Sequence, residues 1–123
     1  MKEQFEDQQF LNIETFRKNG EGVKTPVWFV EEGDAFYVWT VANSWKAKRI
    51  RNNGTVKITP STASGEPVGK WVDAYAKADA SPEALKYVTK LLKKKYGLAF
   101  NGFQMMGKLR KEKYTTIKIE FGK

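Results

Sequence analysis

The alternation of apolar and polar positions along this chain predicts a protein built mainly from β-strands. Short runs rich in Val, Ile, Thr, Phe, Tyr and Trp recur, and turn-forming residues such as Asn19-Gly20 separate them. The predicted strands are 10–16, 23–31, 35–40, 55–60, 70–78 and 114–121. Because tight turns join neighbouring strands, we expect an antiparallel sheet, and closing it into a barrel would remove exposed edges. The pattern therefore predicts a mainly β (α+β) fold, a six-stranded antiparallel barrel with a few flanking helices, and an OB-like barrel is the main alternative.

Three of these strands carry further information about packing. Pro26 cannot donate to a strand ladder, so it marks an edge, a bulge or an opening within 23–31. Both faces of 35–40 are apolar or aromatic, which indicates a strand buried on both sides. One face of 70–78 carries four small side chains, those of Val72, Ala74, Ala76 and Ala78. Such a face indicates the close approach of either a helix or a partner subunit.

Two helices are predicted from their capping residues. Ser44 can cap a short basic helix that Gly54 ends, and Ser81-Pro82-Glu83 begins a longer helix that Gly97 ends. The longer helix has an apolar stripe that should lie in the core, formed by Leu85, Val88, Leu91 and Leu92. Its last turn has three lysines that should be solvated, Lys93, Lys94 and Lys95. The segment 98–113 is less regular, and we expect it to be helical only in part.

Composition bounds the class of protein. The chain has 123 residues, of which 41% are hydrophobic and 14% aromatic, and this fits a single globular domain over 1–123. The formal net charge is +8, and the basic residues concentrate in 46–51 and 86–113, whereas the first part of the chain is near neutral. Such a balance suits nucleic acid, an anionic membrane surface or a polyanionic cofactor, and charge alone does not choose among them.

The absence of two residue types removes several kinds of chemistry. Without cysteine the chain has no disulfide, thiol nucleophile or thiolate metal ligand. Without histidine it lacks the commonest metal ligand, the usual general base and the usual proximal haem ligand, so we expect no metal and no haem. No apolar run approaches the length of a membrane span, and the first residues lack the apolar core of a signal peptide. We therefore expect no membrane partner and a cytoplasmic location.

The segment 40–53, TVANSWKAKRIRNN, carries the strongest candidate chemistry. It contains four cations within the six residues 46–51, namely Lys46, Lys48, Arg49 and Arg51. A helix N-terminus presents free N–H groups and a partial positive charge, so the Ser44 hydroxyl and these cations would together make a phosphate cradle. The alternative is a solvated basic helix face, which is what most charge runs are.

Several segments together resemble the pyridoxamine 5'-phosphate oxidase-like, FMN-binding split-barrel family. These segments are TFRKNGEGVKTPVWFV, FYVWT, NSWKAKRIRNN and the helix that ends in KKYGL. Within that family, the chain is most similar to the small branch of deazaflavin (coenzyme F-420)-dependent oxidoreductases, and the resemblance covers 10–121. It implies a six-stranded antiparallel split β-barrel that forms a homodimer. Two equivalent sites would lie at the subunit interface, each holding FMN or the deazaflavin coenzyme F-420.

The resemblance also implies roles for individual residues. The phosphate-binding pattern is matched by Ser44, Lys46, Lys48 and Arg49. The strand along which the cofactor ring lies, contacted largely through its backbone, is matched by Thr25, Pro26, Val27 and Trp28. Thr40 matches the position that faces the cofactor tail.

Two positions depart from the family pattern. Trp45 stands where a small residue such as Gly is common, and Gly54 stands where Pro is common. We include Trp45 among the candidate cofactor-binding residues, because an indole beside the helix cap would contact whatever binds there. It would either stack on an aromatic ligand or partly fill the phosphate pocket.

The implied activity is that of an oxidoreductase, which transfers a hydride between the bound cofactor and a small organic substrate. Because hydride transfer is the cofactor's own chemistry, the protein needs no side-chain nucleophile. Tyr37, Tyr75, a lysine or water could deliver a proton, and nothing marks one of them as the donor. Two alternatives remain: a cofactor-binding protein without turnover, and a nucleic-acid-binding barrel whose aromatic residues stack on bases. Nucleic acid is the less favoured partner, since the aromatic strands are expected to be buried.

Overall fold

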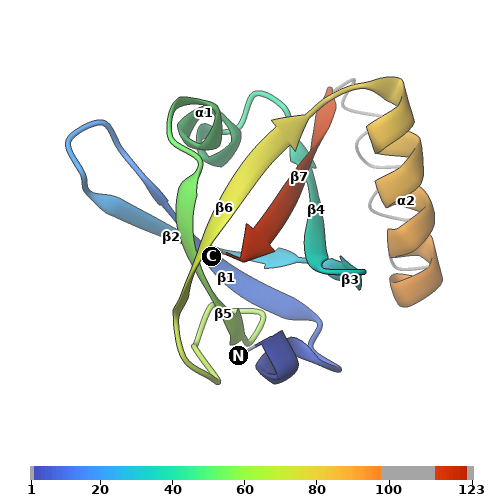
Figure 1. The fold of residues 1–123 in the computed structure, drawn as a ribbon, viewed down its shortest axis with the longest axis horizontal. Coiled ribbons are helices and arrows are strands. Elements are labelled where there is room, and N and C mark those ends of the chain that lie inside the picture. The colour runs from blue at the N-terminus through green and yellow to red at the C-terminus, as the bar shows by residue number, and fades with distance from the viewer. Residues whose placement is uncertain (1, 98–112, 122–123) are drawn as a thin grey trace.

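The computed structural model describes residues 2–97 and 113–121 of the chain (Figure 1). In chain order its elements are η1 (Lys2–Phe5), β1 (Phe10–Phe16), β2 (Gly22–Trp28), β3 (Val30–Glu32), β4 (Ala35–Val41), α1 (Trp45–Asn52), β5 (Thr55–Ser61), β6 (Val72–Asp79), α2 (Pro82–Tyr96) and β7 (Tyr114–Phe121). Apart from Lys113, the segment expected to be partly helical, 98–113, lies outside the described residues. No helix within 2–97 is long and apolar enough to cross a membrane.

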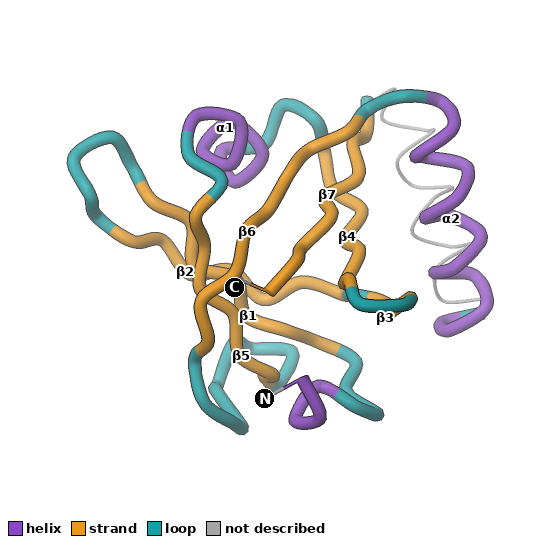
Figure 2. Tube along the Cα trace, in the orientation of Figure 1, coloured by secondary structure: helices purple, strands orange, loops and turns teal. Residues whose placement is uncertain are grey.

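The strands form one curled antiparallel sheet in the order β2-β1-β5-β6-β7-β4-β3. Its two edge strands, β2 and β3, follow each other in the chain with only Phe29 between them. The chain therefore passes directly from one edge of the sheet to the other, and Figure 2 shows the curl that results. A mainly β, antiparallel fold of the split-barrel type, with flanking helices, is confirmed.

The expected count of six strands is wrong, because the predicted strand 23–31 is divided into β2 and β3. The two halves pair with different partners, β2 with β1 and β3 with β4, so the chain has to change ladder between them. Phe29 makes that change; it is 1% exposed, and its N–H donates to the Tyr96 hydroxyl at 3.1 Å. Of the three alternatives given for Pro26, the structure shows the edge, since among the described residues β2 pairs with β1 alone and a missing N–H costs little on an edge.

A large apolar cluster fills the inside of the curl. Its buried members are Phe5, Leu11, Ile13, Phe29, Phe36, Val38, Ile50, Val56, Ile58, Ala74, Ala76, Ile117 and Ile119. The small-residue face of β6 thus turns inward, and of the two neighbours expected for it the structure shows the helix, because Ile50 of α1 belongs to the same cluster. The chain just after α1 comes close to β6 at Gly54, where an added Cβ would lie 2.7 Å from the Ala76 carbonyl oxygen. Gly54 therefore serves this contact, and the helix itself ends earlier, at Asn52 with Asn53 as its cap.

A second, smaller cluster fixes α2 against the sheet. Val88 and Leu92 of the predicted apolar stripe are buried against Val30, with Leu91 packed beside them. Ser81 caps the start of the helix as expected, its hydroxyl accepting from the Ala84 N–H at 3.2 Å. Other partly buried side chains that complete the cluster are Trp28, Tyr37, Trp39 and Tyr96. Strand β4 is accordingly covered on both faces, by the main core on one and by this cluster on the other.

Candidate functional site

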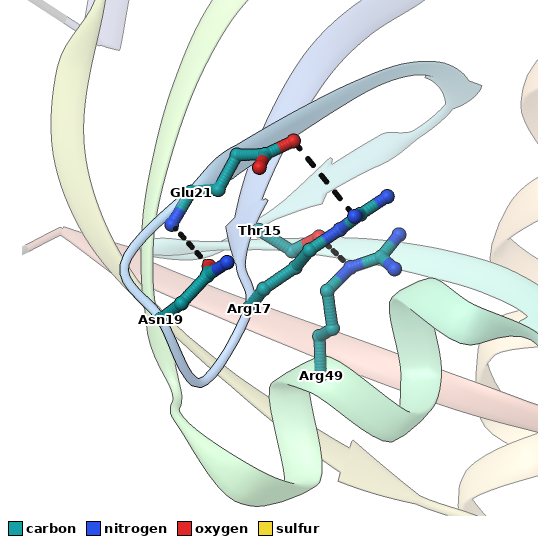
Figure 3. Close-up of polar contacts among 5 residues, drawn as sticks. All are labelled: Thr15, Arg17, Asn19, Glu21 and Arg49. Carbon is teal, nitrogen blue, oxygen red and sulfur yellow. Dashed lines mark hydrogen bonds and ion pairs between the residues drawn. The ribbon is translucent and has the colours of Figure 1, made fainter.

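Helix α1 begins as the sequence predicts, with Ser44 as its cap. The Ser44 hydroxyl accepts a hydrogen bond from the Ala47 N–H at 3.3 Å, and no acidic residue occupies the first turn. Ala47 and Ile50 are buried and anchor one face of the helix in the core. The short helix thus lies at a fixed place beside the β1–β2 hairpin (Figure 1), and Figure 3 shows one of its basic side chains, Arg49, reaching Thr15 of β1.

A groove of about 1020 Å³ lies between that hairpin and α1. It is lined from the hairpin by Phe16, Arg17, Lys18 and Val23, and from the helix and the turn after it by Trp45, Lys48, Arg49, Asn52 and Asn53. Four of these side chains are cationic, and three are apolar or aromatic and can contact a flat apolar ring. The groove thus offers positive charge and apolar surface side by side.

Arg49 is held in place by a buried partner. Its Nε donates to the Thr15 hydroxyl of β1 at 2.8 Å, and Thr15 is 1% exposed (Figure 3). Because this bond uses only Nε, the two terminal nitrogens of the guanidinium remain for other acceptors. A fixed guanidinium loses little side-chain freedom when it binds an anion, which favours binding.

Lys46 is positioned in a similar way at the end of β4. Its Nζ donates to the Thr40 hydroxyl at 3.0 Å. Burial lowers the pKa of Lys46 from its ordinary value, and the nearby charge of Arg49 lowers it further. Two cations held this close to each other are stabilised when an anion binds between or beside them.

Lys48 and Trp45 form the outer part of the site. The Lys48 ammonium lies over the Trp45 ring, 4.7 Å from its centre, and Trp45 is 71% exposed at the rim of the groove. Within the described part of the chain, no carboxylate lies within 4.0 Å of Lys46, Lys48 or Arg49. The positive charge on the helix side of the site is therefore not neutralised by described acidic side chains.

The structure brings some of the predicted site residues together and separates others. Trp45, Lys48 and Arg49 line the groove, while Ser44, Lys46 and Thr40 lie at the start of the same helix and at the end of β4. Thr25, Pro26, Val27 and Trp28 do not line the groove but lie further along β2, whose Val23 does. Val27 packs against the main core, and Trp28 stacks on Tyr96 of α2 with ring centres 4.6 Å apart.

Sequence reasoning missed the hairpin side of the groove. Arg17 and Lys18 stand directly before the Asn19-Gly20 turn. This part of the chain is near neutral overall, so its charge does not indicate an anion site. The available signal was the hairpin itself, since a basic pair at the end of a strand faces whatever packs beside that strand end. That the hairpin packs beside α1 is shown only by the tertiary fold.

Comparison with known proteins identifies the fold. No family model matches the chain, and no curated protein is similar enough in sequence to match it. HutZ of Vibrio cholerae, described as a heme storage protein, has a similar structure with a TM-score of 0.74 and 16% identity, over 99% of this chain and 87% of HutZ. A candidate pyridoxamine 5'-phosphate oxidase of Listeria innocua gives 0.65 and 12%, over 94% and 85%. An F420 reductase gives 0.64 and 14%, over 99% and 93%.

The chain therefore has the split-barrel fold of the pyridoxamine 5'-phosphate oxidase-like proteins. The expected resemblance to that group is confirmed at the level of structure, at low sequence identity. Proteins of this fold differ in what they bind and do, so the activity has to be argued from the site of this chain.

Proposed function

We propose that the protein binds a phosphorylated flavin-type cofactor, FMN or the deazaflavin coenzyme F-420, and works as an oxidoreductase on a small organic substrate. The observation that carries the proposal is the groove between the β1–β2 hairpin and α1, in which Lys48 and Arg49, without a carboxylate partner among the described residues, lie beside apolar side chains. The split-barrel fold adds support, because solved structures of the same fold include an F420 reductase and a candidate pyridoxamine 5'-phosphate oxidase.

The residues present fit such a cofactor in three ways. Lys48 and Arg49 offer charge-assisted hydrogen bonds to a phosphate, and Arg49 is already oriented by Thr15. Apolar contact comes from Phe16, Val23 and Trp45, and the groove is as large as a usual cofactor pocket. Strand β2 leads out of the groove and is an edge of the sheet among the described residues, so the backbone groups that do not face β1 could contact a ring that lies along it.

These contacts define which roles belong to the cofactor and which belong to the protein. When bound, the cofactor supplies the hydride transfer, as an acceptor or donor at its ring. The chain's part is to hold the phosphate with Lys48 and Arg49, and to keep the Arg49 guanidinium fixed through Thr15. Trp45 lies at the rim, where it shields one side of the groove from water. Proton delivery is left to water or a nearby side chain, and we assign no residue to it.

Haem is less well supported as the ligand, although HutZ is described as a heme storage protein. The chain has no histidine and no cysteine, so a haem iron would lack the axial ligands that proteins use most. A cofactor-binding protein without turnover remains the second candidate. It would bind FMN with the same residues but would not accelerate hydride transfer from any reductant.

We also propose that the working unit is a homodimer with the groove near the subunit interface. The support is the exposure of large aromatic residues, since Trp45 is 71% and Tyr75 59% exposed. Exposed aromatic surface of this kind commonly marks a partner surface. Light scattering at micromolar concentration should give about twice the chain mass of 14.1 kDa, and a monomer would contradict this part of the proposal.

The test is a titration of FMN and, separately, of coenzyme F-420, followed by cofactor fluorescence. Replacing Lys48 and Arg49 together by Ala should weaken binding about 10- to 100-fold, because two charge-assisted contacts are lost in a partly exposed site. The matched control replaces Lys90 and Lys93 of α2, both exposed, and should leave the affinity unchanged. Equal losses in both double variants would mean a general attraction of anions, and no binding by the unaltered protein would refute the proposal.

A further inference from the structure

We infer that the groove selects ligands with two linked anionic groups, of which a diphosphate is the simplest, over ligands with a single phosphate. The inference rests on the proposed function for the place of the cofactor, and it states which class of anionic ligand that place binds more tightly. Its basis is that cations approach from both walls, Arg17 and Lys18 from the hairpin and Lys48 and Arg49 from α1.

The geometry joins the two walls at one point. Arg49 of the helix is bonded at 2.8 Å to Thr15 of β1, and Arg17 follows Thr15 by two residues. Arg17 comes directly after the end of β1 at Phe16, and its N–H donates to the Glu21 carbonyl at 2.9 Å, so the hairpin continues past the strand and places Arg17 at the groove. Figure 3 shows the guanidinium ends of both residues pointing in the same direction. An anion held by Arg49 would thus have the hairpin cations next along the groove.

The charges exceed what one phosphate needs. A phosphate monoester carries less than two negative charges near neutral pH and is well satisfied by two cations. Lys48 and Arg49 supply two, and neither has a carboxylate partner within the described residues. Lys18 is a third cation in the lining of the groove and Arg17 a fourth. A second anionic group, linked to the first, would occupy the hairpin wall and use this remaining charge.

Glu21 competes with such a ligand for Arg17. Its carboxylate lies 3.8 Å from the Arg17 guanidinium, and the two side chains are 54% and 61% exposed (Figure 3). An exposed pair at this distance is weak, so an incoming anionic group can replace it. Glu21 itself is held by the turn, since its N–H donates to the Asn19 side-chain oxygen at 2.9 Å. Removing the Glu21 charge should therefore improve the second anion site without disturbing the hairpin.

The experiment compares inorganic phosphate with inorganic pyrophosphate in NMR titrations of the full chain at one fixed, low ionic strength. We expect pyrophosphate to bind about tenfold more tightly and to shift backbone signals at 17–18 as well as at 48–49. The double variant Arg17→Ala/Lys18→Ala should reduce pyrophosphate affinity to that of phosphate and leave phosphate unaffected. The control Lys90→Ala/Lys93→Ala should keep the full preference, and equal losses in the two double variants would overturn the inference.

A second pair of variants tests the same site by a gain of affinity. Glu21→Gln should tighten pyrophosphate binding several-fold, because Arg17 is released and the negative charge beside it is removed. Glu120→Gln is the matched control, since Glu120 forms a similarly exposed pair with Lys118, 4.0 Å apart, on β7 and away from the groove. An equal gain in both variants, or none in Glu21→Gln, would contradict a second anion site at the hairpin.

Comparing FMN with riboflavin separates this inference from the proposed function, because the two share a ring and differ in the phosphate. Suppose that FMN binds more tightly than riboflavin, but that the protein does not bind pyrophosphate more tightly than phosphate through Arg17 and Lys18. The cofactor proposal then stands and the inference fails. If pyrophosphate shows that preference and no flavin binds, the inference about anions stands and the proposed flavin-type cofactor fails.

Discussion

The Tyr96 hydroxyl joins the end of α2 to the corner between β2 and β3, and its removal should have a large effect on stability. The hydroxyl accepts from the Phe29 N–H at 3.1 Å and donates to the Gln9 carbonyl at 2.7 Å or to that of Phe29. Phe29 is the residue at which the chain leaves one ladder for the other, and it is 1% exposed. Its N–H therefore has no strand partner to replace the hydroxyl.

The magnitude for Tyr96→Phe follows from these bonds. One net hydrogen bond is worth about 1 kcal/mol, and a buried N–H left without a partner costs about 1–3 kcal/mol. The ring stays, so its stacking on Trp28 at 4.6 Å is retained. We expect a loss of about 2 kcal/mol in the free energy of unfolding. With a urea slope of about 2 kcal/mol per molar, the unfolding midpoint should fall by about 1 M at unchanged slope.

The matched control is Tyr87→Phe on the same helix. Tyr87 is 47% exposed, its ring packs edge-on against Tyr37 at 5.7 Å, and among the described residues its hydroxyl has no hydrogen-bond partner. Its loss should change the free energy of unfolding by less than about 0.5 kcal/mol. If Tyr96→Phe lowers the urea midpoint no more than Tyr87→Phe, the hydroxyl does not hold the corner and the reasoning is wrong.

The remaining predictions concern the site, a close contact and one lysine. Trp45→Gly should weaken FMN binding about tenfold in a fluorescence titration if the indole stacks on the ligand, and tighter binding would show that it blocks the pocket. Ser44→Ala and Ser81→Ala should each cost about 1 kcal/mol in thermal unfolding, because each removes a helix cap, but only the first should weaken FMN binding. Gly54→Ala should destabilise by about 1–3 kcal/mol, because its Cβ would meet a backbone carbonyl at 2.7 Å, and an unchanged melting temperature would refute that contact. Burial lowers the pKa of Lys95 from 10.5 to about 8, so between these pH values the unfolded chain binds more protons than the folded chain. The free energy of unfolding should therefore rise as the pH increases from about 8 to about 10.5. Urea unfolding at several pH values should show this rise in the unaltered protein and not in Lys95→Met.

Local sequence patterns predicted most of the elements of this fold. The strands 10–16 and 114–121 have the predicted bounds, because runs of seven or eight residues rich in apolar, β-branched and aromatic side chains favour a strand wherever they occur. The start of α2 at Ser81-Pro82 was equally local, since a cap and the proline after it act only on the helix that they begin. In the same way, the basic cluster of α1 was visible because its members lie within one short helix.

The tertiary structure decided what depended on distant partners. The division of 23–31 at Phe29 could not be read from the sequence, because both halves have strand character and only their different partners separate them. Lys93, Lys94 and Lys95 are exposed as predicted, but the Lys95 ammonium also has fixed partners, since it donates to the carbonyls of Gln8 and Phe29 at 2.8 Å each. These acceptors are more than sixty residues away in the chain, so no local sequence pattern predicts the two hydrogen bonds.

The candidate site divides in the same way. The sequence by itself determined the cations and the indole of α1, together with the absence of histidine and cysteine, and these define what chemistry is available. Only the tertiary structure added Arg17 and Lys18, because they reach the groove through the packing of the β1–β2 hairpin beside α1. The physical reason is that residue type is fixed along the chain, whereas the sum of charges around a ligand depends on which segments the fold brings together.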